Sequence, residues 1–288
     1  MNQMNVVLKT FTFFIGLIFS FLAVAQDRSL KSLVYELEQS YSIEICYDSI
    51  EIAALKFEIP LIKKSGYISR MSNRFDITLQ KDTSIIKQHL QLLIKEFRIY
   101  PNDYFQRIGM KFLCLLQSVY YGKSKREAVP DNFRETLMLE SSDRLIDKTT
   151  YLKYAFHHDL HHYAEHGTDL DLRRKWEKWD RLNPRKFKYF GSGAMQDDER
   201  FAHVNFHHFH PYDGFITNYA LTAAVEDRAD IVAYFLITEY REQVMPLLLE
   251  DKRLKKKVDF MLDLLNEISG TTDNYWMDAL QASYIDTH

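Results

Sequence analysis

Apolar residues recur at helical spacing along much of the chain. Leu30, Leu33, Val34 and Leu37 predict a helix over 29–40. Further helices are predicted over 83–98 with Thr83 or Ser84 as the cap, from Asp147 or Thr149 to Gly167, around Trp176 and Trp179, from about Thr222 to Tyr240, and after Pro246 over about 250–268.

Shorter apolar runs predict a small number of strands. They cover 41–47, 110–121 and 134–141, with 122–133 expected to be a polar loop. Residues 195–217 show neither the helical nor the strand period of apolar residues and are expected to be irregular. Few strands among many helices predict the α+β class.

The first 25 residues differ from the rest. An apolar run ends in Ala23-Val24-Ala25, the pattern that signal peptidase cleaves, and it is short for a transmembrane helix. We therefore expect a signal peptide over 1–25, a secreted or periplasmic location and no stable membrane span after cleavage. An uncleaved anchor is the alternative.

Composition excludes one class of partner. The chain has 288 residues and a net charge of -3, whereas a protein that binds nucleic acid needs a basic surface. Its two cysteines, Cys46 and Cys114, lie in apolar settings. A disulfide between them is possible, and buried free thiols are slightly favoured.

The most informative segment is the predicted helix that reaches Gly167. His158 and His162 are four residues apart, so both imidazoles lie on one helix face, where a pair can bind zinc. Asp159 follows the first histidine and can face a metal-bound water. His157 and His161 form a second pair, but no acid follows His157. The pattern favours the first pair over this one and over a histidine-rich surface helix.

A third zinc ligand is expected from the next helix. Glu226 can reach the metal, and Asp230 lies four residues later on the same face, where it can orient a ligand histidine. The apolar residues that follow, among them Ile231 and Val232, argue that these acids are buried and need partners.

These motifs resemble the gluzincin metallopeptidases, and specifically a bacterial, exported group of zinc-binding metallopeptidases whose active site is similar to that of anthrax lethal factor. In that pattern a tyrosine precedes the ligand Glu by seven residues and an acid follows it by four, as in the string GFITNYALTAAVEDRAD. The string WEKWDRLNPRKFKY also resembles the segment between the two motifs, and the likeness covers roughly 100–265.

The resemblance implies a fold and a set of roles. The fold would be zincin-like, with a small mixed sheet packed on the active-site helix and a mainly helical C-terminal part. Residues 26–100 would pack on a catalytic domain over 101–288. His158, His162 and Glu226 would bind Zn²⁺, and Tyr219 would donate to the oxyanion of a peptide or protein substrate.

One position departs from that family. Asp159 stands where the family has Glu, and Asp is shorter by one C–C bond, about 1.5 Å. The expected activity is therefore an exported zinc metallopeptidase with Asp159 as its base. The alternative is a weak or inactive zinc-site protein that binds peptide or glycan at the cell surface, and a purely structural metal site is a third possibility.

Two other histidine patterns remain. His203, His207, His208 and His210 could line a cleft or bind a second metal, although a loop with interspersed aromatic residues is favoured. The dipeptide His158-Asp159 also resembles HD-domain phosphohydrolases, but their further histidine would have to be His89, which lies on an ordinary amphipathic helix.

Overall fold

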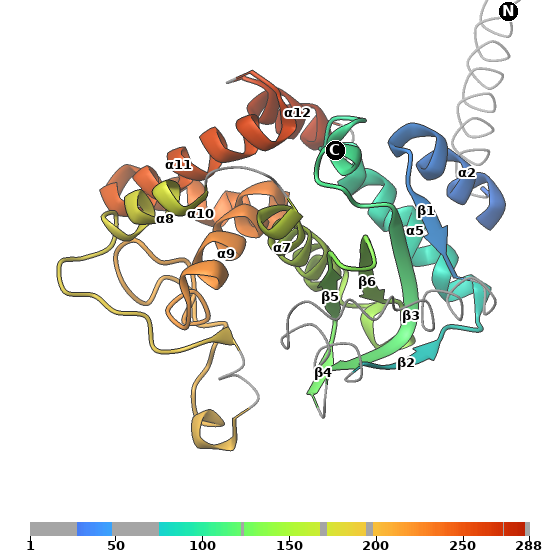
Figure 1. The fold of residues 1–288 in the computed structure, drawn as a ribbon, viewed down its shortest axis with the longest axis horizontal. Helices are drawn as coiled ribbons and strands as arrows, with labels where there is room; N and C mark the ends of the chain where they lie inside the picture. Colours follow the sequence, from blue (N-terminus) through green and yellow to red (C-terminus); the bar gives the residue numbers. More distant parts are fainter. Residues whose placement is uncertain are drawn as a thin grey trace, which may run out of the picture.

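The computed structural model describes residues 28–47, 75–121, 124–167, 172–193, 198–272 and 274–285. The predicted signal peptide over 1–25 lies outside these residues. The described chain combines one small mixed sheet with many helices, which confirms the α+β class (Figure 1). In the part of the chain that is described, no helix has both the length and the apolar character needed to cross a membrane.

The long strand β3 organises the sheet. β3 runs parallel to β1 and β6 through its first half and antiparallel to β2 and β4 through its second half, while β5 pairs with β6 at the edge. The strands are β1 Glu44–Cys46, β2 Phe75–Leu79, β3 Phe112–Tyr121, β4 Ser124–Arg126, β5 Ala128–Asp131 and β6 Thr136–Glu140.

Helices make up most of the remaining structure. They are α2 Leu30–Tyr41, α5 Thr83–Phe97, α6 Tyr104–Arg107, α7 Thr149–Gly167, α8 Leu172–Asp180, α9 Ala224–Leu236, α10 Thr238–Glu250, α11 Lys252–Ser269 and α12 Tyr275–Ile285. Asp82 caps α5, because its carboxylate accepts the N–H of Ser84 at 2.8 Å, so the prediction of Thr83 or Ser84 as the cap was wrong.

Three predicted elements are wrong in detail. The helix expected over 222–240 is divided at Ile237, whose backbone is extended between α9 and α10. Pro246 lies inside α10 and does not separate two helices. The expected loop over 122–133 contains β4 and β5, which form antiparallel hairpins with the neighbouring strands β3 and β6. Pro130 is tolerated because β5 is an edge strand.

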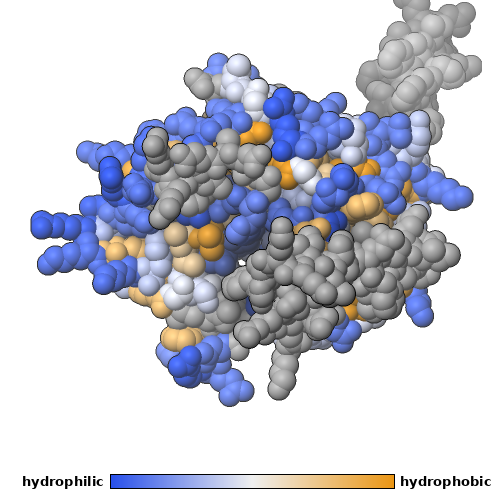
Figure 2. All heavy atoms as spheres, in the orientation of Figure 1, coloured by the Kyte–Doolittle hydropathy of each residue, from blue (hydrophilic) through white to orange (hydrophobic). Residues whose placement is uncertain are grey.

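Helix α7 lies at the centre of the molecule. It packs on β5 and β6 on one side and on α9 on the other, so it separates the sheet from the C-terminal helices (Figure 1). One continuous apolar core runs from Leu33 in α2 to Leu280 in α12. On the face drawn in Figure 2, apolar atoms appear in small areas between hydrophilic side chains.

Candidate metal centre

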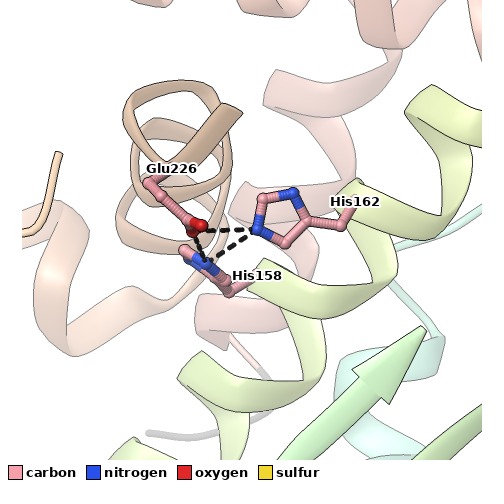
Figure 3. Close-up of side chains that lie close together, drawn as sticks. All are labelled: His158, His162 and Glu226. Atoms are coloured by element: carbon pink, nitrogen blue, oxygen red, sulfur yellow. Dashed lines mark hydrogen bonds and ion pairs between the residues drawn. The ribbon is translucent and has the colours of Figure 1, made fainter. Parts of the chain in front are cut away.

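Three side chains from two helices converge at the interface of α7 and α9. His158 and His162 project from one face of α7, and Glu226 projects from the first turn of α9 (Figure 3). Glu226 Oε2 lies 3.0 Å from Nε2 of His158 and 3.0 Å from Nε2 of His162, and the two imidazole nitrogens are 3.1 Å apart. The structure therefore brings together the three residues that the sequence singled out as ligands.

The three donor atoms fit a zinc ion. With Zn–N and Zn–O bonds of about 2.0–2.2 Å, tetrahedral ligands are separated by about 3.3 Å, close to the spacings of this triangle. Two imidazoles and one carboxylate also form the donor set of catalytic zinc sites, which keep the fourth position open. His158 and Glu226 are at most 9% exposed, so the centre is shielded from bulk solvent on the protein side.

Asp230 lies where a second carboxylate can orient a ligand. Its Oδ1 is 3.4 Å from Nδ1 of His158, and that ring nitrogen has no hydrogen-bond partner among the described atoms. Asp230 is fixed in turn by the hydroxyl of Tyr154, which donates to Oδ1 at 2.5 Å, and by the hydroxyl of Thr217, which donates to Oδ2. The contacts of Tyr154 and Thr217 with Asp230 could not be predicted from sequence, because both depend on the tertiary fold.

The alternative pair, His157 and His161, has other partners. His157 contacts Glu96 through Nε2 at 2.9 Å and the hydroxyl of Tyr100 through Nδ1 at 2.7 Å. His161 contacts Glu165 through Nε2 at 2.9 Å. Each histidine therefore has its own acidic partner, Glu96 of α5 for His157 and Glu165 of α7 for His161, and the two rings do not form a common donor set.

Glu165 also connects the two ligand-bearing helices. Its carboxylate accepts two hydrogen bonds from the guanidinium of Arg228, at 2.5 and 3.0 Å. His161, Glu165 and Arg228 form a buried group in which each residue is at most 5% exposed. Glu165 follows His162 by less than one turn of α7, and Arg228 follows Glu226 by two residues in α9. The pair therefore fixes the spacing of the helices beside the candidate ligands.

The electrostatics of the centre favour positive charge. Burial alone would lower the pKa of His158, but the carboxylates of Asp230 and Glu226 raise it to about 10. Burial opposes ionisation of Glu226, yet hydrogen bonds to His158 and His162 lower its pKa well below the usual value. Carboxylates that hold a proton on a buried imidazole would equally stabilise a bound cation.

Asp159 and Tyr219 lie beside the three donors. Burial raises the pKa of Asp159, and the nearby His158 and His162 partly offset that rise. The Tyr219 ring centroid is 5.7 Å from that of His158, and the Tyr219 hydroxyl is close enough to Glu226 for their charges to interact. Burial, together with the charges of Glu226 and Asp159, raises the pKa of Tyr219, so its hydroxyl remains a proton donor.

The remaining histidines lie elsewhere. His203, His207 and His208 are exposed in the loop before α9, and His89 contacts the Ser141 hydroxyl at 2.7 Å. His210 approaches Asp213 and Asp251, the only other histidine and acid group of this kind among the described residues. However, Asp251 already accepts four N–H contacts, from Gly214, Arg253, Leu254 and His210, as the cap of α11. This group is better explained as a cap than as a metal site.

Comparisons with known proteins add one structural likeness. The sequence matches no protein-family model and no curated protein. The structure is similar to a crystal structure from Bacteroides caccae described as a "putative zinc-binding metallo-peptidase", with a TM-score of 0.48 and 14% sequence identity over 89% of this chain and 94% of that one.

Proposed function

We propose that this protein is an exported zinc metallopeptidase that hydrolyses peptide bonds in peptide or protein substrates. The observation that carries the proposal is the triangle of His158, His162 and Glu226, whose donor atoms lie 3.0–3.1 Å apart with Asp159 and Tyr219 beside them. The packing of a small mixed sheet on α7 is compatible with a zincin-like fold, which belongs to the same proposal.

Each side chain has a role in that chemistry. Zinc, when bound, would polarise the scissile carbonyl and acidify a water. His158, His162 and Glu226 would hold the metal, and Asp230 would keep the His158 ring in its ligating orientation. The Asp159 carboxylate would accept the proton of the attacking water and deliver it to the leaving amine. The Tyr219 hydroxyl would donate a hydrogen bond to the developing oxyanion.

Asp159 also supports a second candidate function. A base that is displaced by about 1 Å can lose on the order of a hundredfold in rate. With the shorter side chain of Asp159, the same centre could serve a zinc-site protein that binds peptide or glycan with little turnover. The two functions share the zinc site and differ in whether a peptide bond is cleaved.

The metal is tested by elemental analysis of purified protein. We expect about one zinc per chain, lost in His162→Ala and retained in the control His208→Ala, because the His208 side chain is exposed and is not one of the three donors. Digestion of a broad peptide library by the zinc-loaded protein then distinguishes peptidase from binding protein. Protein that takes up no zinc even when zinc is supplied would refute both.

Export is part of the proposal and has its own test. The Ala23-Val24-Ala25 pattern predicts cleavage before Gln26. Mass spectrometry of the protein from its native cell envelope should therefore find Gln26, or its pyroglutamate form, at the N-terminus. An intact N-terminus in the membrane fraction would show an uncleaved anchor.

A further inference from the structure

The segment 187–193 lies beside the chain that leads into α9. The N–H of Phe190 donates to the carbonyl of Leu221 at 3.0 Å, and the N–H of Gly191 donates to the carbonyl of Thr222 at 2.8 Å. These bonds fix the segment next to the residues that immediately precede the Glu226 helix. Its backbone position is therefore coupled to that of the candidate ligand.

Side chains anchor the same segment from behind. The hydroxyl of Tyr189 accepts hydrogen bonds from Trp179 and Asn183, each at 3.0 Å, and donates to Oδ2 of Asp227 at 2.7 Å. Asp227 is the residue next to Glu226 and is also bound by the buried amine of Lys257 at 2.7 Å. The anchors thus end on the helix turn that carries the candidate ligand.

The segment reaches the metal centre at Gly193. A Cβ atom built at this buried position would lie 2.1 Å from Glu226 Oε1 and 2.6 Å from the Tyr219 hydroxyl oxygen. Non-bonded carbon and oxygen atoms do not approach so closely, so the carboxylate occupies the space that any other residue would need for its side chain. The opposite oxygen of the same carboxylate, Oε2, is the one that faces the two histidines.

We propose that Gly193 is a positioning residue of the zinc centre, which holds the Glu226 carboxylate in its ligating orientation by leaving room for Oε1 and Tyr219. This inference rests on the proposed zinc site. The Gly193 backbone lies beside Oε1 of the carboxylate, and the two imidazoles lie beside Oε2. The carboxylate is therefore held between them with Oε2 in the donor triangle.

The proposal predicts different effects with and without metal. Without zinc, only the contacts with His158 and His162 hold the carboxylate, so the end of this flexible side chain can move away from a new methyl group at a smaller cost and the fold is retained. With zinc, Oε2 must stay in the triangle, so the methyl group and the ligand compete for one space. Gly193→Ala should therefore weaken zinc binding by about 10- to 100-fold, the range typical of residues that orient a ligand.

Zinc affinity of the full chain, measured by competition with a chromophoric chelator, tests the proposal. Ser192→Ala is the matched control, because Ser192 is the neighbouring residue, is exposed and already carries a Cβ. We expect Ser192→Ala to bind zinc like the wild type, and chelator-treated Gly193→Ala to unfold at the wild-type temperature. Bound Co²⁺ should also show altered visible absorption bands in Gly193→Ala, because the carboxylate ligation changes.

A double-mutant comparison separates direct contact from a general effect. In Glu226→Asp the carboxylate ends about 1.5 Å further back, so adding Gly193→Ala should cost much less zinc affinity than it does in the wild type. Wild-type zinc affinity in Gly193→Ala, or an equal loss in both backgrounds, would overturn the proposal while leaving the zinc site intact. Failure of the wild type to bind zinc would instead refute the proposed function, and this inference with it.

Discussion

Asp159 is the single residue on which turnover should depend most directly. Asn has the same shape as Asp but cannot accept a proton from water, so Asp159→Asn should abolish peptide cleavage and leave zinc content unchanged. Tyr219→Phe should lower kcat by a smaller factor, about 10²–10³, as for other oxyanion donors. Steady-state kinetics on a peptide cut by the wild type, with zinc content measured in parallel, checks both expectations. Full activity in Asp159→Asn would show that another group is the base.

The substitution Asp159→Glu distinguishes an adapted enzyme from a weakened one. If the site has adjusted to the shorter acid, Glu will crowd the water and reduce the rate. If it has not, Glu should raise or create activity. Should neither the wild type nor Asp159→Glu cleave any member of a broad library, the zinc-site binding protein becomes the better explanation.

At the level of residues, short-range pattern accounts for part of the site. The spacing of His158 and His162 places them on one face of any helix, so their proximity needed no tertiary information. Glu226 lies 64 residues after His162 in sequence and was identified through the buried acidic helix and the family motif. Gly193 could not be identified in this way. Its importance depends on the close contact between the segment 187–193 and the start of α9, which no sequence period indicates.

At the level of elements, the geometry of the centre depends on the pairing of α7 with α9. Glu165→Gln should lower the free energy of unfolding by about 3–5 kcal/mol, because the buried guanidinium of Arg228 would lose the two charge-assisted hydrogen bonds that the Glu165 carboxylate accepts. Urea denaturation at neutral pH in the presence of chelator measures this directly. Asp259→Asn, at an exposed ion pair with Lys255, is the control and should change stability by less than about 1 kcal/mol.

The buried pair of Glu165 and Arg228 also predicts that stability depends on pH in the acid range. Burial would raise the pKa of Glu165, but His161 and Arg228 lower it to about 2 from the usual 4.5. A carboxyl group with a lowered pKa in the folded state stabilises the protein fully above the unfolded value, and this contribution is lost as pH falls from about 4.5 through about 2. The difference in unfolding free energy between wild type and Glu165→Gln should therefore narrow over this window. A difference that stays constant down to pH 2 would contradict the assignment.

The sequence predicted the helices that have clear apolar periods, and it failed where contacts between elements determine the structure. Helix α7 ends at Gly167 as expected, since its apolar residues and glycine terminus agree. Strands β4 and β5 were missed because the polar segment containing them becomes a strand only through pairing with β3 and β6. Ile237 was placed inside a helix because no proline or glycine next to it in the sequence marks the extended residue that separates α9 from α10.

At the level of the whole molecule, the ends of the described chain share one core. Leu33 in α2 and Leu280 in α12 belong to the same apolar cluster, and β1 and β3 lie in one sheet with Cys46 directly opposite Cys114. Both cysteines are free and buried, in agreement with the slightly favoured expectation. The continuity of this core could not be predicted from sequence patterns, because it depends on which distant segments meet.

Zinc should stabilise this molecule as a unit, because its ligands come from two helices that pack in that common core. A ligand at about 1,000 times its Kd adds about 4 kcal/mol to the folded state, which for a chain of this size raises Tm on the order of 10 °C. Calorimetry with zinc and with chelator should show this difference in the wild type. Glu226→Gln should lose most of the shift between its own zinc-loaded and chelated forms, and exposed Glu250→Gln should keep it. An undiminished shift in Glu226→Gln would mean that zinc binds elsewhere, whereas its loss would assign zinc-dependent stability to the contact between α7 and α9.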